Sequence, residues 1–106
     1  MPATFPKLQD MTLFCQRSFV GGVWTPATDG AVFEVRDPAT GQTIGTVANL
    51  SAAQAHAAVD QAAAAFPAWS GLLPQVRAGM LRRWFDLIVA HREDLARLMV
   101  AEQGKP

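Results

Sequence analysis

The feature that most constrains this chain is a long apolar stripe within residues 74–106, which needs a partner surface. Apolar side chains recur at helical spacing up to His91 and again from Leu95 onward. Recurrence at i, i+3 and i+4 places side chains on one face of an amphipathic helix. The sequence therefore predicts two consecutive helices, whose apolar faces carry Met80, Leu81, Trp84, Leu87, Ile88, His91, Leu95, Leu98 and Met99.

The second helix is predicted to end within the sequence Glu102-Gln103-Gly104-Lys105-Pro106. Gly104 suits the left-handed backbone conformation that commonly follows the last helical turn. Pro106 cannot extend a helix, and Lys105 lies near its negative dipole end. These residues together form a helix stop.

The partner surface that the rest of the chain offers is thin. An alanine-rich helix is predicted from Ala52 to Phe66, with Ser51 as its N-cap. Pro67 is expected to end it, which would leave Trp69 in a short connection. Alanine favours helix formation but buries little area, so this helix offers little to pack against. Its apolar line consists of Ala55, Val59, Ala62 and Phe66.

Two β-hairpins are predicted ahead of the helices. The first joins residues 17–20 to residues 23–25 through Gly21-Gly22, because glycine tolerates the positive φ angles of a two-residue turn. Trp24 gives this hairpin something to bury.

The second hairpin joins residues 32–36 to residues 43–48. The intervening Asp37-Pro38-Ala39-Thr40-Gly41 has the chemistry of a type I turn. Ile44 and Val47 fall on opposite faces of the returning strand, so a β-bulge at Gly45 is expected to correct the register.

Charge and composition exclude several kinds of partner. Nine basic and nine acidic residues cancel, which argues against nucleic-acid or anionic-membrane binding through bulk charge. No apolar run approaches the roughly 20 residues of a membrane span, and the first residues do not resemble a signal peptide. A cytoplasmic location is therefore expected. The single cysteine cannot form an intramolecular disulfide.

Three residues are candidates for nucleophilic or acid–base chemistry. Cys15 is the only thiol, but no base or helix N-terminus near it in the sequence would activate it. His56 and His91 fall on different predicted helices, and neither has a carboxylate at a spacing that would orient it. A packed or capping role is the better interpretation for His91.

The basic residues also have ordinary interpretations. Arg82-Arg83-Trp84-Phe85 resembles a basic-aromatic nucleic-acid patch, yet helical spacing turns Trp84 toward the core and the two arginines outward. Arg82 with Asp86, and Glu93 with Arg97, have the i, i+4 spacing of surface ion pairs. Gly104-Lys105 lacks the spaced glycines of a phosphate-binding loop. These residues alone predict no active site.

The chain carries five landmarks in order: Val20-Gly21-Gly22-Val23-Trp24; Asp37-Pro38-Ala39-Thr40-Gly41; the alanine-rich helix with Phe66-Pro67-Ala68-Trp69; Arg77 with Leu81; and Glu102-Gln103-Gly104-Lys105-Pro106. Their order and spacing resemble the N-terminal segment of an aldehyde dehydrogenase, from about Leu13 to Pro106. Within that superfamily, residues 81–88 and 94–99 are most similar to NAD(P)-dependent succinate-semialdehyde dehydrogenases.

The resemblance implies an enzyme several times longer than this chain. Such enzymes oxidise an aldehyde through a thiohemiacetal on a cysteine, pass hydride to NAD or NADP, and use a glutamate as the base for hydrolysis. None of these catalytic or cofactor-binding residues has a matching position here, and Cys15 does not match the family nucleophile. No catalytic, cofactor-binding or metal residue is therefore predicted in this segment, which alone should bind no cofactor and be inactive.

The expected fold is α+β, with two hairpins followed by three helices, as the N-terminal part of the α/β cofactor-binding domain. Residues 1–12 are interpreted as a flexible lead-in and residues 13–106 as an incomplete domain. The expected partner is the remainder of the dehydrogenase chain, in a homo-oligomer. Two alternatives stay open: a dehydrogenase for another small aldehyde, and a stand-alone α+β interaction module.

Overall fold

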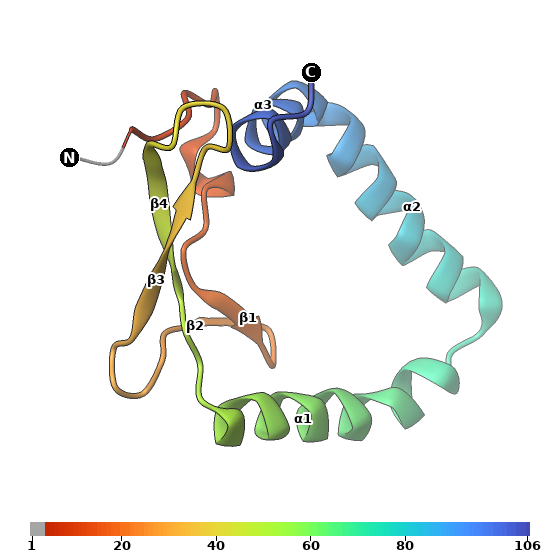
Figure 1. The fold of residues 1–106 in the computed structure, drawn as a ribbon. Helices are drawn as coiled ribbons and strands as arrows, with labels where there is room; N and C mark the ends of the chain where they lie inside the picture. Colours follow the sequence, from red (N-terminus) through yellow and green to blue (C-terminus); the bar gives the residue numbers. More distant parts are fainter. Residues whose placement is uncertain (1–3) are drawn as a thin grey trace.

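The structure, a computed structural model, describes residues 4–106 and shows the predicted order of two hairpins and three helices (Figure 1). The first three residues of the predicted lead-in lie outside the described residues. The elements are a 3-10 helix Met11–Leu13, strands β1 Ser18–Val20, β2 Val23–Thr25, β3 Val32–Arg36 and β4 Thr43–Ala48, and helices α1 Ala52–Ser70, α2 Pro74–Ala90 and α3 Arg92–Gln103.

The first hairpin pairs β1 with β2 in the antiparallel sense, as predicted. Gly21 and Gly22 take φ angles of 57° and 80°, which only glycine adopts readily in succession. Phe19 lies opposite Trp24, and their ring centroids are 5.0 Å apart. This aromatic pair joins the two strands of the hairpin.

The second hairpin contains an irregularity in β4, but it falls at Ile44, one residue before the predicted position at Gly45. Val35 pairs with Gly45 but Arg36 pairs with Thr43, so Ile44 is the extra residue on that strand. Ile44 is only 4% exposed. Gly45 also meets the residues ahead of β1, because a Cβ atom there would lie 2.7 Å from Cζ of Phe14. A larger residue at position 45 would push Phe14 away from the strand.

Helix α1 begins as predicted but ends later. The Ser51 hydroxyl accepts from the Gln54 N–H and the Gln54 side chain accepts from the Ser51 N–H, which completes a capping box. The prediction that Pro67 ends the helix is wrong, because the helix continues to Ser70. Pro67 lacks an N–H group, which removes one hydrogen bond from the helix. The last turn still forms, because the Pro67 carbonyl accepts from the Gly71 N–H at 3.0 Å. Trp69 therefore lies on the last turn of α1.

Helices α2 and α3 follow one another with only His91 between them. The His91 N–H donates to the Leu87 carbonyl, and the His91 carbonyl accepts from the Leu95 N–H. His91 therefore caps both helices. At the other end of α3, Gly104 takes the predicted left-handed conformation, with a φ of 66°.

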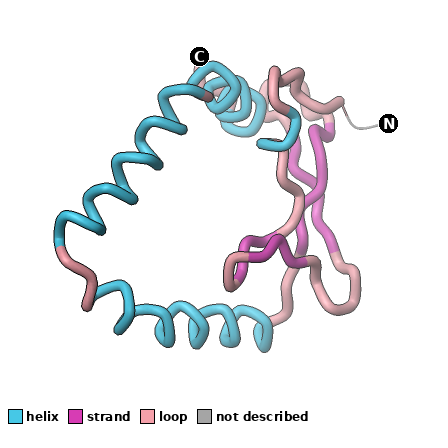
Figure 2. Tube along the Cα trace, turned by 180° about the vertical axis from the view of Figure 1, so that it is seen from behind, coloured by secondary structure: helices cyan, strands magenta, loops and turns pink. Residues whose placement is uncertain are grey.

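The elements form an open frame. Figure 1 and Figure 2 show α1 and α2 diverging from residues 71–73, with the hairpins on the side opposite that corner. The radius of gyration is 16.7 Å, against about 13 Å for a compact domain of this length. The accessible surface is 8039 Å², whereas a compact protein of 11.4 kDa exposes about 5,800 Å². The side chains of the described residues therefore enclose very little core.

The prediction that Trp84 faces a core is wrong within residues 4–106. Trp84 is 63% exposed. Helix α1 runs away from α2 and does not cover it along its length (Figure 1). The apolar line of α1 is equally uncovered: Val59 is 67% exposed and Phe66 is 64% exposed. The predicted stripe exists, but this part of the chain does not cover it.

Candidate functional site

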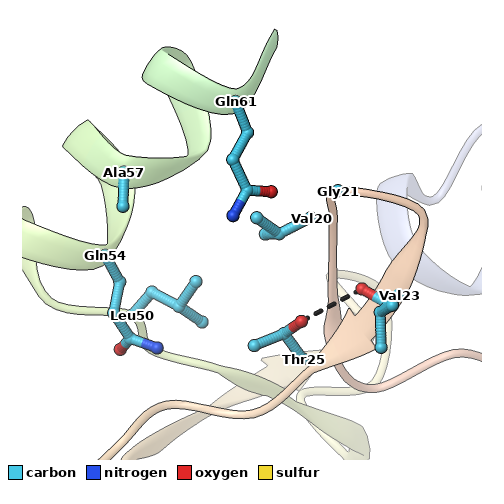
Figure 3. A pocket seen from close by; sticks show the side chains of 8 residues that line it. All are labelled: Val20, Gly21, Val23, Thr25, Leu50, Gln54, Ala57 and Gln61. Atoms are coloured by element: carbon cyan, nitrogen blue, oxygen red, sulfur yellow. Dashed lines mark hydrogen bonds between the residues drawn. The ribbon is translucent and has the colours of Figure 1, made fainter. Parts of the chain in front are cut away.

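A hollow of about 360 Å³ lies between the first hairpin and α1 (Figure 3). Its lining consists of Val20, Gly21, Val23, Thr25, Leu50, Gln54, Ala57 and Gln61. None of these side chains titrates or acts as a nucleophile at neutral pH. The Gln54 amide is already bonded, since it donates to the Pro26 carbonyl and accepts from the Thr28 N–H. This hollow therefore supplies packing surface and no catalytic groups.

The three candidate chemical residues lie on separate elements. Cys15 is exposed, and its thiol donates to the Thr12 carbonyl at 3.2 Å. His56 lies on α1 beside Val59 in a shallow apolar hollow. His91 lies at the α2–α3 junction, as its predicted capping role requires. No nucleophile–base pair appears among the hydrogen bonds of residues 4–106.

The basic residues of α2 take surface roles. Nε of Arg82 lies 3.6 Å from Oδ1 of Asp86, which is the predicted i, i+4 pair. The Arg82 guanidinium also lies 4.8 Å from the centre of the Phe85 ring. These contacts satisfy Arg82 within its own helix.

The prediction of an ion pair between Glu93 and Arg97 is wrong. Nε of Arg92 lies 3.9 Å from Oε1 of Glu93, and Arg97 instead donates to the Lys7 carbonyl at 3.0 Å. Arg97 is therefore bonded to the residues preceding β1.

The described part of the chain shows neither a metal-binding cluster nor a membrane-spanning helix. Residues 4–106 contain no group of three or more His, Cys, Asp or Glu side chains placed to hold a metal ion. None of the helices formed by these residues is long and apolar enough to cross a membrane. The expectation of no catalytic, cofactor-binding or metal residue in this segment stays a prediction.

No local signal in the sequence predicts the role of Asp94, the most deeply buried polar side chain among the described residues. Asp94 is 3% exposed. Its two carboxylate oxygens accept from the backbone N–H groups of Gln9 and Asp10, at 2.8 and 3.0 Å. An acidic residue in the first helical turn usually stabilises its own helix, so nothing local signals a bond to a segment 85 residues away.

These donors also set the charge state of Asp94. The N–H groups of Gln9 and Asp10 hold the pKa of Asp94 below its ordinary value of 3.8, although desolvation works in the opposite direction. Arg97 and His91 lower the pKa of Asp94 further, by smaller amounts. The pKa of Asp10 is also lowered, mainly because the Thr12 hydroxyl and N–H donate to its carboxylate.

Acidification should therefore loosen the contact between Gln9 and α3. A carboxyl group with a depressed folded-state pKa contributes stability above its unfolded pKa, and that contribution is lost as the pH falls through the folded value. We expect the amide signals of Gln9 and Asp10 to be constant from about pH 7 to about pH 5 and to shift below about pH 4. Two-dimensional NMR of the labelled chain measures this. Amide signals that stay fixed down to about pH 2 would contradict it.

The comparisons with known proteins agree with this arrangement. Residues 24–106 match the aldehyde dehydrogenase family. The chain is 47% identical over 100 residues to a glutarate-semialdehyde dehydrogenase of Pseudomonas aeruginosa. It is 45% identical over 100 residues to the NADP(+) succinate-semialdehyde dehydrogenase of Escherichia coli. Each alignment covers 94% of this chain and 21% of the relative.

Solved structures extend the likeness to the fold. An NADP-dependent enzyme of E. coli superposes with a TM-score of 0.91 at 45% identity. A succinate-semialdehyde dehydrogenase of Burkholderia pseudomallei superposes with a TM-score of 0.90 at 43% identity. Each superposition covers 94% of this chain and 21% of the solved chain. The chain belongs to the aldehyde dehydrogenase family and corresponds to its N-terminal segment.

Proposed function

We propose that this chain is the N-terminal scaffold of an NAD(P)-dependent aldehyde dehydrogenase that acts on succinate semialdehyde. The observation that carries the proposal is the superposition of 94% of the chain on 21% of a solved NADP-dependent enzyme, with a TM-score of 0.91. The chain spans about a fifth of the length of the curated relatives it matches. Its hairpins and helices then support a cofactor site and a reaction centre built from later residues.

The names of the relatives support the proposed substrate class. Those compared above act, by their names, on the semialdehydes of glutarate and succinate, at 47% and 45% identity. Both substrates carry an aldehyde at one end and a carboxylate at the other. We assign succinate semialdehyde as the first substrate to test and glutarate semialdehyde as the second. The complete enzyme is further proposed to be a cytoplasmic homo-oligomer.

The 106-residue chain alone should form no NADH or NADPH from succinate semialdehyde. Cys15 is exposed and bonded only to the Thr12 carbonyl, and neither histidine reaches it through a hydrogen bond of the described residues. The measurement is absorbance at the reduced-nicotinamide wavelength, with purified chain and either cofactor. A rate above background that disappears in Cys15→Ser would overturn both the assignment of inactivity and the interpretation of Cys15.

A hybrid enzyme tests the scaffold role directly. The present chain would replace the matching N-terminal residues of the E. coli succinate-semialdehyde dehydrogenase, to which it is 45% identical. We expect a folded hybrid that oxidises succinate semialdehyde with NADP. The control hybrid lacks these residues altogether and should be inactive. A full-length hybrid that folds without oxidising any semialdehyde would contradict the proposal.

A further inference from the structure

The residues preceding β1 are bonded to the second hairpin at both ends of the segment. The Thr4 N–H donates to the Thr43 carbonyl of β4 at 2.8 Å. Further along, the Ala48 N–H donates to the Gln16 carbonyl, and the Thr46 N–H donates to Oε1 of Gln16, both at 3.0 Å. Phe14 lies between these points, directly against Gly45. Residues 4–16 therefore follow β4.

The middle of the same segment is bonded to α3. Gln9 and Asp10 donate their N–H groups to the two carboxylate oxygens of Asp94, and Lys7 accepts from Arg97. Figure 1 shows this segment running between the second hairpin and α3, near the C-terminal end of the chain. It thus bridges two elements that lie about 50 residues apart in the sequence.

The bonding of Asp94 makes this bridge specific. A buried carboxylate is costly unless hydrogen-bond donors compensate it, and here two N–H groups of one segment supply one bond to each oxygen. The titratable groups around it are His91 and Arg97, from the α2–α3 junction and α3, and Asp10 from the segment itself. Glu93 lines the same hollow of about 220 Å³.

We propose that residues 4–16 form a strap, clasped by the Asp94 carboxylate, that holds the second hairpin against α3. The clasp sets the distance between the two elements, while the ends of the strap set its position along β4. Direct approach of the two elements occurs at the end of α3, where a Cβ atom on Gly104 would lie 3.0 Å from Cγ of Pro38. Releasing the clasp should leave this corner of the frame free to open.

Asp94→Asn in the hybrid enzyme described above, which is expected to be folded, tests the strap. Asparagine keeps the side-chain shape but replaces one acceptor oxygen by an N–H donor that faces the backbone N–H of Gln9 or Asp10. We expect hydrogen exchange at Gln9 and Asp10 to accelerate about tenfold or more, as for loss of a bond to a charged group. Trypsin cleavage after the exposed Lys7 should accelerate with it. The matched control is Glu93→Gln, which removes an exposed charge from the same helical turn and should change neither rate.

Two further readouts separate the strap from a general loss of folding. Exchange of the α3 amides from Leu98 to Val100 should be unchanged in Asp94→Asn. Arg97→Gln, which removes only the bond to Lys7, should accelerate trypsin cleavage by a smaller factor. Unchanged exchange at Gln9 and Asp10 in Asp94→Asn would overturn the proposal. Loss of α3 protection together with the strap would also overturn it, because Asp94 would then be needed by the helix itself.

Discussion

Replacing Trp84 by alanine should leave the thermal transition of the 106-residue chain almost unchanged and destabilise the complete enzyme by about 3–5 kcal/mol. In the described residues the Trp84 ring is 63% exposed, so its removal costs few contacts. In the enzyme proposed above, the apolar face of α2 is covered by later parts of the chain. Truncation of a buried tryptophan then leaves a large cavity. Thermal and urea unfolding of both proteins measure the difference.

Arg83→Ala is the matched control for Trp84→Ala. Arg83 is the neighbouring residue on α2 and is also exposed, but it lacks the apolar surface that a covering domain would bury. Its replacement should change the stability of either protein by no more than about 0.5 kcal/mol. Equal, small effects of both substitutions in the complete enzyme would show that α2 presents another face to its partner.

The 106-residue chain on its own should bind a hydrophobic dye and associate at micromolar concentration. Its accessible surface of 8039 Å² exceeds by a wide margin the roughly 5,800 Å² of a compact protein of this mass. Much of the excess is apolar, since Leu81, Phe85 and Met99 are each more than half exposed. Apolar patches of this kind promote association, and the strand edges that residues 4–16 do not cover add a second route. Size-exclusion chromatography with light scattering, repeated over a range of concentrations, measures it.

The alternative interaction module makes the opposite prediction for this experiment. Such a module would give one species of fixed stoichiometry, little dye binding and a cooperative melt. A clean monomer with a sharp two-state transition would contradict the scaffold account of the chain's physical behaviour. The family assignment, which rests on the match over residues 24–106, would be unaffected.

Local signals in the sequence were sufficient to place most of the secondary structure. Gly21-Gly22 and the turn at Asp37 specify hairpins by their own backbone preferences, and Ser51 forms its cap with a residue three positions away. The end of α1 was misplaced because one proline near a helix terminus removes a single bond. The helix continues past Pro67 and ends with the bond from the Gly71 N–H to the Pro67 carbonyl.

Contacts between distant residues were not predictable in the same way. The partners of Asp94 lie 84 and 85 positions away, and Arg97 bonds to a carbonyl 90 positions away. Helical spacing therefore suggested an ion pair between Glu93 and Arg97. In the structure Arg97 donates to the Lys7 carbonyl instead. The stripe on α2 was correctly found, but spacing alone cannot show whether this segment supplies the surface that Trp84 needs. The prediction that the segment contributes no catalytic group depended on the family resemblance as well as on the absence of a local motif.

The single-residue junction at His91 has a consequence for how sequences of this kind can diverge. Only His91 separates α2 from α3, so the apolar face of α2 is fixed in its rotation relative to α3. Successive residues of an α-helix are rotated by about 100° around its axis. Insertion of one helical residue at this point would therefore rotate the apolar stripe of α2 by about 100° relative to α3. Substitutions at position 91 can be absorbed as long as the backbone bonds to Leu87 and Leu95 persist.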